Sequence, residues 1–246
     1  MRTHWAIIFL REEVRFERRR PQSRTKCVVE PGSRALSILR ALGVKYLETR
    51  DRISPLLTKL NMNTDQPVLK ELNQRKSVRG FLPKEIESEK LDVLWAAAQW
   101  APSSANKQEW HYYAVTGEAR QKLAEVLNQG NQWALKAPLI LGVTRDGSIE
   151  NKTESREYGM YDVALSVMSL VVEVEHQGLR AHQMAGFKDE AFRRVLSIQE
   201  KEIPVVMIAV GYEGEAKGLD PIVQAKEDRP RTRKPINEVV KILENL

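Results

Sequence analysis

Apolar and polar positions from residue 63 onward fall into segments with two different periods. Helical spacing of apolar residues runs through 91–101, and Pro102 ends this predicted helix because proline disfavours helical backbone in the residue before it. Short apolar runs at 111–116, 138–144 and 203–212 predict strands. Strands that alternate with helices indicate a layered α/β domain.

The segment 158–177 is the most apolar of the predicted helices, with apolar side chains around most of its circumference. A helix of this kind must be buried on nearly all sides. In a domain of this size, that implies either a central helix or a helix shared with a second subunit. Gly178 follows it in the position that glycine favours after a helix C-terminus.

Weaker patterns predict the remaining elements. A first core helix can be capped by Thr64 or Asp65, with Pro67 in its first turn. The apolar face of this helix consists of Val68, Leu69 and Leu72. Further helices are predicted at 118–127, through 192–196 and around 239–243, and 145–156 is predicted as a polar loop.

Charge divides the 246-residue chain unevenly. Residues 1–61 hold 14 Lys and Arg against 6 Asp and Glu, whereas residues 62–246 hold 25 against 27. The net charge of +6 therefore belongs to the first segment, and it does not indicate nucleic-acid binding by the rest. With 42% hydrophobic residues, the chain can bury a substantial core.

We therefore expect a basic N-terminal extension, 1–61, and a main domain, 62–246. The extension, with one predicted amphipathic helix at 33–42, is either a poorly ordered solvated tail or a start-site artefact in which Met62 is the true start. The apolar run 6–10 is too short for a signal peptide, and no run approaches the roughly 18 residues of a membrane span. These features predict a cytoplasmic protein without a membrane partner.

Several chemistries are excluded by what the sequence lacks. The single cysteine, Cys27, lies in the extension, so no intramolecular disulfide is possible and thiolate catalysis in the main domain is excluded. The four histidines show no ligand spacing, so no metal site is expected. The phosphate loops G-x-G-x-x-G and G-x-x-x-x-G-K-[ST] and the nucleophile motif G-x-S-x-G are missing.

Polar chemistry concentrates in the turn between the helix 91–101 and the strand 111–116. Its hydrogen-bonding side chains are those of Ser103, Ser104, Asn106 and Gln108. Such a turn can line a polar site, but the same residues also form ordinary surface loops. The flanking Trp100 and Trp110 favour a turn that is anchored against aromatic surface.

Three stretches in this order resemble the FMN-dependent nitroreductase family. They are Arg75-x-Ser77-x-Arg79, then Pro102-Ser103-Ser104-x-Asn106-x-Gln108-x-Trp110, then His182-Gln183-Met184-Ala185-Gly186-Phe187, and the closing Arg231-Thr232-Arg233 also fits. The resemblance covers about residues 66–242. It implies a three-layer fold with a central mixed sheet flanked by helices and a long buried central helix, bound FMN, and a homodimer with the flavin at the subunit seam.

The resemblance also assigns roles at the cofactor phosphate. It implies that Arg75 and Arg233, assisted by Arg231, hold the phosphate, and guanidinium groups suit that geometry. Lys76 and Ser77 would lie there or along the ribityl chain. Arg79 would approach the edge of the ring.

Other residues would contact the ring itself. Asn106 offers a donor and an acceptor side by side for the pyrimidine edge, next to Pro102, Ser103 and Ser104, whereas Gln108 either joins it or braces the turn. The family places backbone N–H groups of Ala185 and Gly186, after Met184, against the flavin N5. An acidic residue is common in some branches where this chain has Ala185, which affects substrate preference and leaves the backbone donors unchanged.

The resemblance implies ping-pong reduction by NADPH or NADH of a small-molecule acceptor such as a nitroaromatic or a quinone. No side chain is assigned as certainly catalytic. His182 either gives a proton to the substrate or is satisfied by a backbone partner. One alternative is a flavin enzyme of the same fold with another reaction, such as reductive dehalogenation or enal or enone reduction. The others are a non-catalytic flavin-binding protein and a nucleic-acid-binding protein that uses the basic extension.

Overall fold

The structure is a computed structural model that describes residues 68–243. Residues 68–233 lie in one compact unit, and residues 234–243 belong to a second unit that contains only α9 (Ile236–Val239) among the described elements. The predicted helix at 33–42 and the capping residues Thr64 and Asp65 lie outside the described part. The division of the chain at residue 62 stays a prediction.

A four-stranded sheet forms the centre of the larger unit, in the order β1 (Trp110–Thr116), β2 (Leu139–Asp146), β6 (Glu202–Gly211) and β5 (Arg180–Met184). The three strands predicted from apolar runs are confirmed as β1, β2 and β6. Every pairing is antiparallel, so the expectation of a mixed sheet is corrected for the described strands. The strands β2 and β5 run in the same direction, but they do not pair with each other, because β6 lies between them.

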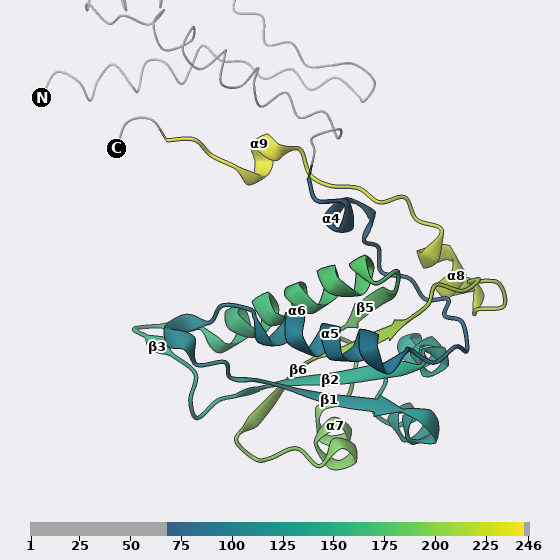
Figure 1. Cartoon of the computed structure of the whole chain (residues 1–246), viewed down its shortest axis with the longest axis horizontal. Helices are drawn as coiled ribbons and strands as arrows, with labels where there is room; N and C mark the ends of the chain where they lie inside the picture. The colour runs from purple at the N-terminus through teal and green to yellow at the C-terminus, as the bar shows by residue number, and fades with distance from the viewer. Residues whose placement is uncertain (1–67, 244–246) are drawn as a thin grey trace, which may run out of the picture. The chain divides into compact units, whose positions relative to one another are not determined.

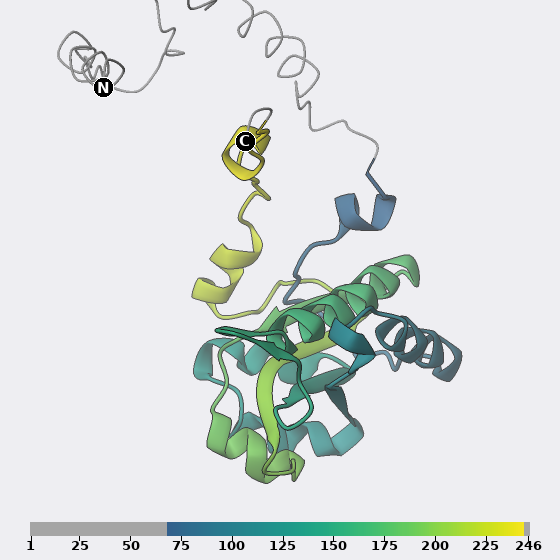
Figure 2. The ribbon, with the colours of Figure 1, turned by 90° about the vertical axis from the view of Figure 1, so that its left-hand side faces the viewer.

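Helices cover both faces of this sheet (Figures 1 and 2), which confirms the layered α+β class. One face is covered by α5 (Ser88–Gln99) and α6 (Gly159–His176). The other carries α7 (Asp189–Leu196) and two 3₁₀ segments, η2 (Gly117–Ala124) and η3 (Gln129–Lys136).

The alternation of side chains along the strands divides the core into two clusters. In β2, Leu139 and Leu141 pack with α5 and α6, whereas Ile140 between them packs with the opposite layer. In β6, Ile208 and Met207 separate in the same way. Both faces of the inner strands are therefore apolar, which explains their continuous apolar runs in the sequence.

The predicted helix 158–177 is confirmed as α6, which ends shortly before Gly178. The φ of Gly178 is 74°. Its sheet side is buried, including Val163, Leu170 and Val174. A stripe on the other side remains open, with Met160 53%, Tyr161 61% and Met168 38% exposed. The described chain therefore encloses α6 only on part of its circumference.

Smaller elements depart from the predictions. The helix predicted at 118–127 is the 3₁₀ segment η2, and the predicted polar loop contains a hairpin of β3 (Lys152–Thr153) and β4 (Arg156–Glu157). The first core helix is only α4 (Lys70–Gln74), and its predicted apolar face is exposed. The helix α8 (Pro221–Glu227) was not predicted, although Asp220 caps it and Pro221 occupies its first position.

None of the helices in residues 68–243 has the length and hydrophobicity needed to cross a membrane.

Candidate functional site

The polar turn, residues 102–108, is held by hydrogen bonds among its own side chains. Ser103 Oγ accepts the Gln108 backbone N–H at 2.9 Å, and Gln108 Nε2 donates to Asn106 Oδ1 at 3.0 Å. Ala105, Asn106 and Gln108 have φ values of 52°, 54° and 48°, a region that is costly for residues other than glycine. The turn that contains η1 (Ser104–Asn106) is therefore a defined conformation, with Gln108 as its brace.

The same turn is attached to the start of α6. The Ser104 backbone N–H donates to Asp162 Oδ2 at 2.9 Å, and Asn151 Nδ2 donates to Ser104 Oγ at 2.7 Å. Asp162 lies in the first turn of α6. Asn106 is exposed beside this anchor, where its amide can meet a ligand.

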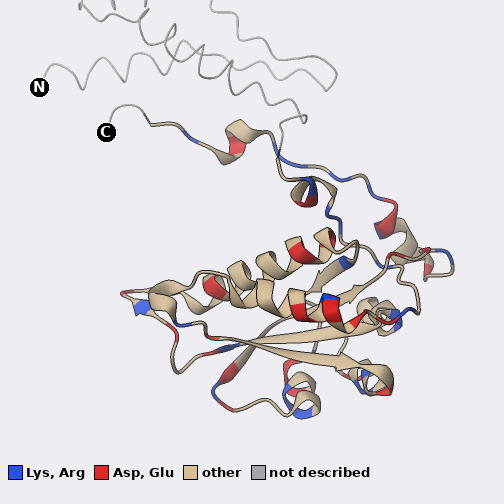
Figure 3. Ribbon diagram, viewed as in Figure 1, with Lys and Arg blue, Asp and Glu red and all other residues tan. Residues whose placement is uncertain are grey.

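Three arginines gather beside the last turn of α6, and we call Arg75, Arg231 and Arg233 the arginine cluster. Burial, followed by the positive charges of Arg233 and Arg231, lowers the pKa of Arg75. Arg231 Nη1 donates to the Asn73 carbonyl at 2.5 Å, which ties the tail to the segment after α4. Figure 3 shows basic residues along both segments, whereas the middle of α6 is uncharged.

The arginine cluster has the electrostatics of an anion site. Within residues 68–243, no carboxylate lies within ion-pair distance of these three guanidinium groups. Mutual repulsion of this kind is relieved by a bound anion, and planar guanidinium groups suit phosphate oxygens. The structure thus brings together the three arginines that were predicted to hold a phosphate.

Two neighbouring basic residues are engaged by acidic side chains. Lys76 Nζ lies 2.6 Å from Glu213 Oε1, and Arg79 Nη1 lies 3.2 Å from Glu227 Oε2 of α8. Arg79 also lies over the Trp133 ring of η3, 5.9 Å from its centroid. Ser77, between them, is exposed. Arg79 therefore has a structural partner besides its predicted place at the ring edge.

The end of β5 presents free backbone donors. In the hydrogen bonds among the described residues, no acceptor meets the N–H groups of Ala185 and Gly186, whereas the Gly186 carbonyl accepts from Asn131 Nδ2 at 2.9 Å. A Cβ at Gly186 would lie 2.8 Å from this Asn131 nitrogen, so a larger residue would require the Asn131 side chain to move away from the Gly186 carbonyl. Met184 is buried in the core beneath them.

His182 is enclosed rather than open to a substrate. Its Nδ1 lies 2.8 Å from the Val78 carbonyl, and its ring packs on Trp133 at a centroid distance of 4.6 Å. Burial lowers the pKa of His182 to about 4, so the ring is neutral at pH 7 and donates its Nδ1–H to Val78. Of the two roles predicted for His182, this environment favours the backbone-satisfied one.

Two of the predicted groups, the polar turn and the arginine cluster, lie at opposite ends of α6. The polar turn contacts Asp162 in its first turn, and the arginine cluster lies in the field of Glu175 near its last turn. These two residues are separated by thirteen helical positions, or about 20 Å at 1.5 Å per residue. The arginine cluster shares its end of the molecule with the Val78–His182 contact to β5.

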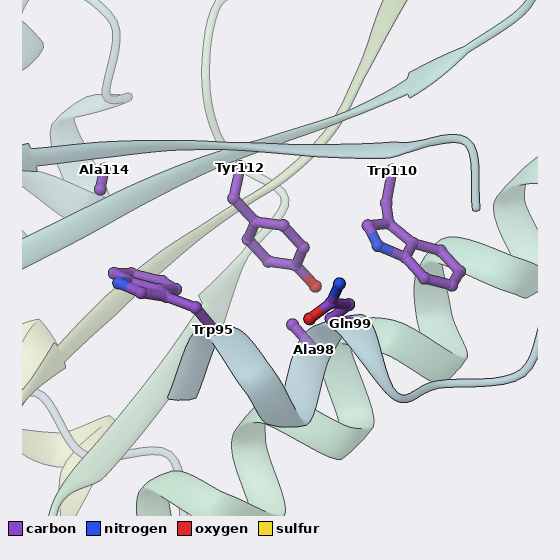
Figure 4. Close-up of a pocket in the computed structure, with 6 residues that line it drawn as sticks. All are labelled: Trp95, Ala98, Gln99, Trp110, Tyr112 and Ala114. Atoms are coloured by element: carbon purple, nitrogen blue, oxygen red, sulfur yellow. The ribbon is translucent and has the colours of Figure 1, made fainter. Parts of the chain in front are cut away.

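A separate pocket of about 250 Å³ opens between α5 and β1. Figure 4 shows the Tyr112 ring between Trp95 and Trp110, with its hydroxyl pointing toward α5. That hydroxyl lies 2.9 Å from Ser166 Oγ of α6. The two tryptophans that flank the polar turn in the sequence therefore differ: Trp110 lines this pocket, and Trp100 is 86% exposed.

Sequence reasoning missed two acidic residues beneath the polar turn, Glu109 and Asp162, which are both buried. Glu109 directly follows Gln108, and its polarity at the start of an apolar strand was the available signal. Asp162 lies in the most apolar helix of the chain, where a lone acid in the first turn is also typical of ordinary helices.

Comparison with known proteins identifies the class to which this fold and site belong. The model of the nitroreductase family matches residues 72–145 and 127–212, and the chain belongs to this family. A protein of Methanothermobacter thermautotrophicus whose name includes NAD(P)H nitroreductase is 28% identical over 156 residues, which span 61% of this chain and 80% of the relative. The FMN reductase (NAD(P)H) of Bacillus subtilis is 23% identical over 171 residues, 63% of this chain and 69% of the relative.

Solved structures agree on the fold. An oxidoreductase described as containing FMN superposes with a TM-score of 0.65 at 26% identity, covering 74% of this chain and 94% of that chain. A nitroreductase family protein from Clostridium difficile 630 has a TM-score of 0.60 at 22% identity and covers 75% of this chain and all of that chain.

Proposed function

We propose that this protein binds FMN between two copies of the chain and uses NADPH or NADH to reduce small electrophilic acceptors such as nitroaromatics and quinones. The names of the relatives support an NAD(P)H-dependent FMN oxidoreductase. The observation that carries the proposal for the cofactor site is the arginine cluster, whose three cations have no carboxylate within ion-pair distance in the described chain.

The residues present fit the three chemical demands of FMN. The phosphate dianion suits the arginine cluster, because the negative charge of the phosphate would offset the repulsion among the three arginines. The pyrimidine edge alternates donors and acceptors and suits the exposed amide of Asn106. The free N–H groups of Ala185 and Gly186 suit an acceptor atom on the ring.

A second copy of the chain would bring these groups together. Within one copy, the polar turn and the arginine cluster are held at opposite ends of α6. Two α6 helices that pack antiparallel about a twofold axis would set the first turn of one copy beside the last turn of the other. The exposed apolar stripe of Met160, Tyr161 and Met168 is the surface that this packing would bury.

When bound, FMN supplies the redox chemistry by accepting a hydride equivalent from NAD(P)H and passing electrons to the acceptor. The protein's residues bind and orient. The arginine cluster fixes the phosphate, and the braced turn presents Asn106 in one conformation. The N–H dipoles of Ala185 and Gly186 favour negative charge nearby.

His182 has no proton to give near pH 7, because its pKa is lowered to about 4 by burial. Protons for the reduced product therefore come from solvent or from the substrate side in this proposal.

Absorption spectroscopy of natively prepared protein tests the proposal. We expect the visible absorption of oxidised flavin, bleached by NADPH or NADH under anaerobic conditions and restored by a nitroaromatic or a quinone. Protein that is colourless and does not bind added FMN at micromolar concentration would overturn the cofactor assignment. Protein that binds FMN but is not bleached would be a non-catalytic flavin binder.

The acceptor class requires its own experiment. Steady-state rates with nitrofurazone, a benzoquinone, an enone and a halophenol, at equal NADPH concentration, separate the proposed activity from enone reduction and dehalogenation. We expect nitrofurazone and the quinone to be fastest, with parallel double-reciprocal lines for a ping-pong mechanism. Halide release at a comparable rate would contradict this acceptor class and leave the FMN site intact.

A further inference from the structure

Two acidic side chains at the base of the polar turn are buried with oxygens that the described residues leave unsatisfied. Glu109 is fully buried, and neither of its carboxylate oxygens has a hydrogen-bond partner within residues 68–243. Asp162 is 1% exposed, and its Oδ1 also lacks a partner in this range. Buried carboxylates are normally paired or fully hydrogen-bonded, so this pair requires an explanation.

The nearby positive charge of Arg145 is shared with other acids through its Nη atoms, whereas its buried Nε has no hydrogen-bond partner within residues 68–243. Arg145 of β2 contacts Glu150 through Nη1, and its Nη2 lies 3.4 Å from Glu157. Glu150 is itself only 8% exposed. The charged group that acts on the pair from β2 is Arg145, and beyond it lie Glu150 of the following loop and Lys152 and Glu157 of the hairpin, which contact Arg145 or one another.

We propose that Glu109 and Asp162 hold one proton between them, with the Glu109 carboxyl donating to Asp162 Oδ1, and that this proton fixes the polar turn. Asp162 then accepts two hydrogen bonds, from Glu109 at Oδ1 and from the Ser104 backbone N–H at Oδ2. Glu109 and Asp162 are positioning residues, because they act on the turn and not on a substrate. Their effect on the cofactor rests on the proposed function of the turn.

Electrostatics agree with this geometry. Burial raises the pKa of Glu109, and the adjacent Asp162 carboxylate raises it further, against the opposing effects of the Glu109 backbone N–H and of the Arg145 charge. The described residues contain no group of three or more His, Cys, Asp or Glu that could hold a metal ion, so a shared proton is the simpler way to compensate the pair.

The pair makes the turn sensitive to rising pH. Because the folded-state pKa of Glu109 is raised above the ordinary 4.5, its proton is held at low pH and lost as the pH rises through the folded value. Two carboxylates then repel each other in a buried site, and the loss strains the Asp162 anchor of Ser104. We therefore expect the turn to loosen as the pH rises.

Infrared spectroscopy tests the proton directly, without any cofactor. At a pH above the ordinary carboxyl values of about 4 and below the raised folded-state pKa of Glu109, the wild-type protein should show the carbonyl band of a buried protonated carboxylic acid, and Glu109→Gln and Asp162→Asn should each remove it. Glu202→Gln is the matched control, because Glu202 is equally buried but accepts from Thr144 Oγ1 at 2.6 Å and from Tyr113 at 2.8 Å. A wild-type protein without the band, or a band that survives Glu109→Gln, overturns the proposal.

FMN affinity as a function of pH tests the coupling to the turn. Corrected for the second ionisation of a phosphate at about 6, the wild-type affinity should fall by up to about tenfold per pH unit as the pH rises through the folded-state pKa of Glu109 and the pair loses its proton. Glu109→Gln keeps an N–H donor for Asp162 and should give a flat profile, while Glu202→Gln should follow the wild type.

Equal pH profiles for the wild type and Glu109→Gln would refute the coupling. If the protein binds no FMN at all, the proposed function fails, but the infrared result still decides whether the proton is shared.

Discussion

The arginine cluster beside the last turn of α6 and the polar turn beside its first turn hold their polar groups by different means. The turn is satisfied internally, because Ser103, Asn106 and Gln108 bond to one another and Ser104 bonds to Asp162. The charges of the arginine cluster are not balanced within the cluster, because Arg75, Arg231 and Arg233 repel each other. The cluster therefore gains energy from the charge of a ligand, whereas the turn contributes through the shape it already has.

The same contrast applies to pH. His182 bonds to the Val78 carbonyl and so anchors the segment that carries Arg75 and Arg79 to β5, and protonation at low pH opposes its burial. Under our proposal, the turn is weakened instead by loss of a proton as the pH rises through the folded-state pKa of Glu109. The two ends should therefore respond to pH in opposite directions.

The largest effect is expected from separating the two copies. Met168→Glu places a charge in the middle of the exposed apolar stripe of α6, which would lie at the subunit interface. If the turn and the cluster meet only across that interface, FMN affinity should fall by more than about 1,000-fold, since several contacts of roughly 1–3 kcal/mol each are lost. Sedimentation velocity and FMN titration on the same samples measure both effects.

Ile222→Glu provides the control for separating the copies, because Ile222 is 69% exposed on α8 and away from the stripe. It should change neither mass nor affinity. A monomeric Met168→Glu variant with full FMN affinity would show that one copy completes the site alone, and the comparison between the two ends would lose its functional meaning.

Removing charge from the cluster should have the next largest effect. Arg75→Ala with Arg233→Ala should weaken FMN binding by between about 100-fold and 10,000-fold, because each charge-assisted contact contributes roughly 1.5–3 kcal/mol. Titration with riboflavin, which lacks the phosphate, should show little change. Arg229→Ala, an exposed arginine of the same tail, is the control. Equal losses for FMN and riboflavin would mean that the cluster does not hold the phosphate.

Much of the fold could be predicted because the spacing of apolar residues in most elements has the period of a helix or of a strand. The continuous apolar runs of β2 and β6 follow from burial of both their faces, and Pro102 marks the end of the helical segment before the turn. The 3₁₀ form of η2 could not be predicted, because the apolar spacing of Leu123, Val126 and Leu127 is the same for an α-helix. The N-cap Asp220 of α8 was a readable signal that was overlooked.

The site could be predicted only in part, because local motifs do not reveal distant pairings. The arginine cluster was expected from alternate arginines in two segments, and the structure brings these segments together. The contact between Ser104 and Asp162 joins residues far apart in the sequence, and the apolar circumference of α6 does not tell which side stays exposed. The sequence also did not reveal that Lys76 pairs with Glu213 or that Arg79 pairs with Glu227.

Acid should destabilise the end of the molecule that carries the cluster. Burial lowers the pKa of His182 to about 4, below its ordinary value of 6.5, so its contribution is present above pH 6.5 and is lost as the pH falls toward 4. Full protonation would cost up to roughly 3 kcal/mol. Urea unfolding at several pH values measures this, and His182→Asn, which keeps an N–H donor without a titration, should show a shallower decline. An unchanged decline would place the acid sensitivity in other groups.

The smallest effect is expected inside the turn. Ser103→Ala removes the acceptor of the Gln108 backbone N–H and should cost about 0.5–1.5 kcal/mol, or roughly 2-fold to 10-fold in FMN affinity. The loss should be nearly the same for riboflavin, since the turn acts on the ring end. Ser148→Ala, which removes a similar side-chain contact to Asp146 outside the turn, serves as the control. A loss confined to FMN would place the turn at the phosphate instead, and the assignment of the two ends would have to be exchanged.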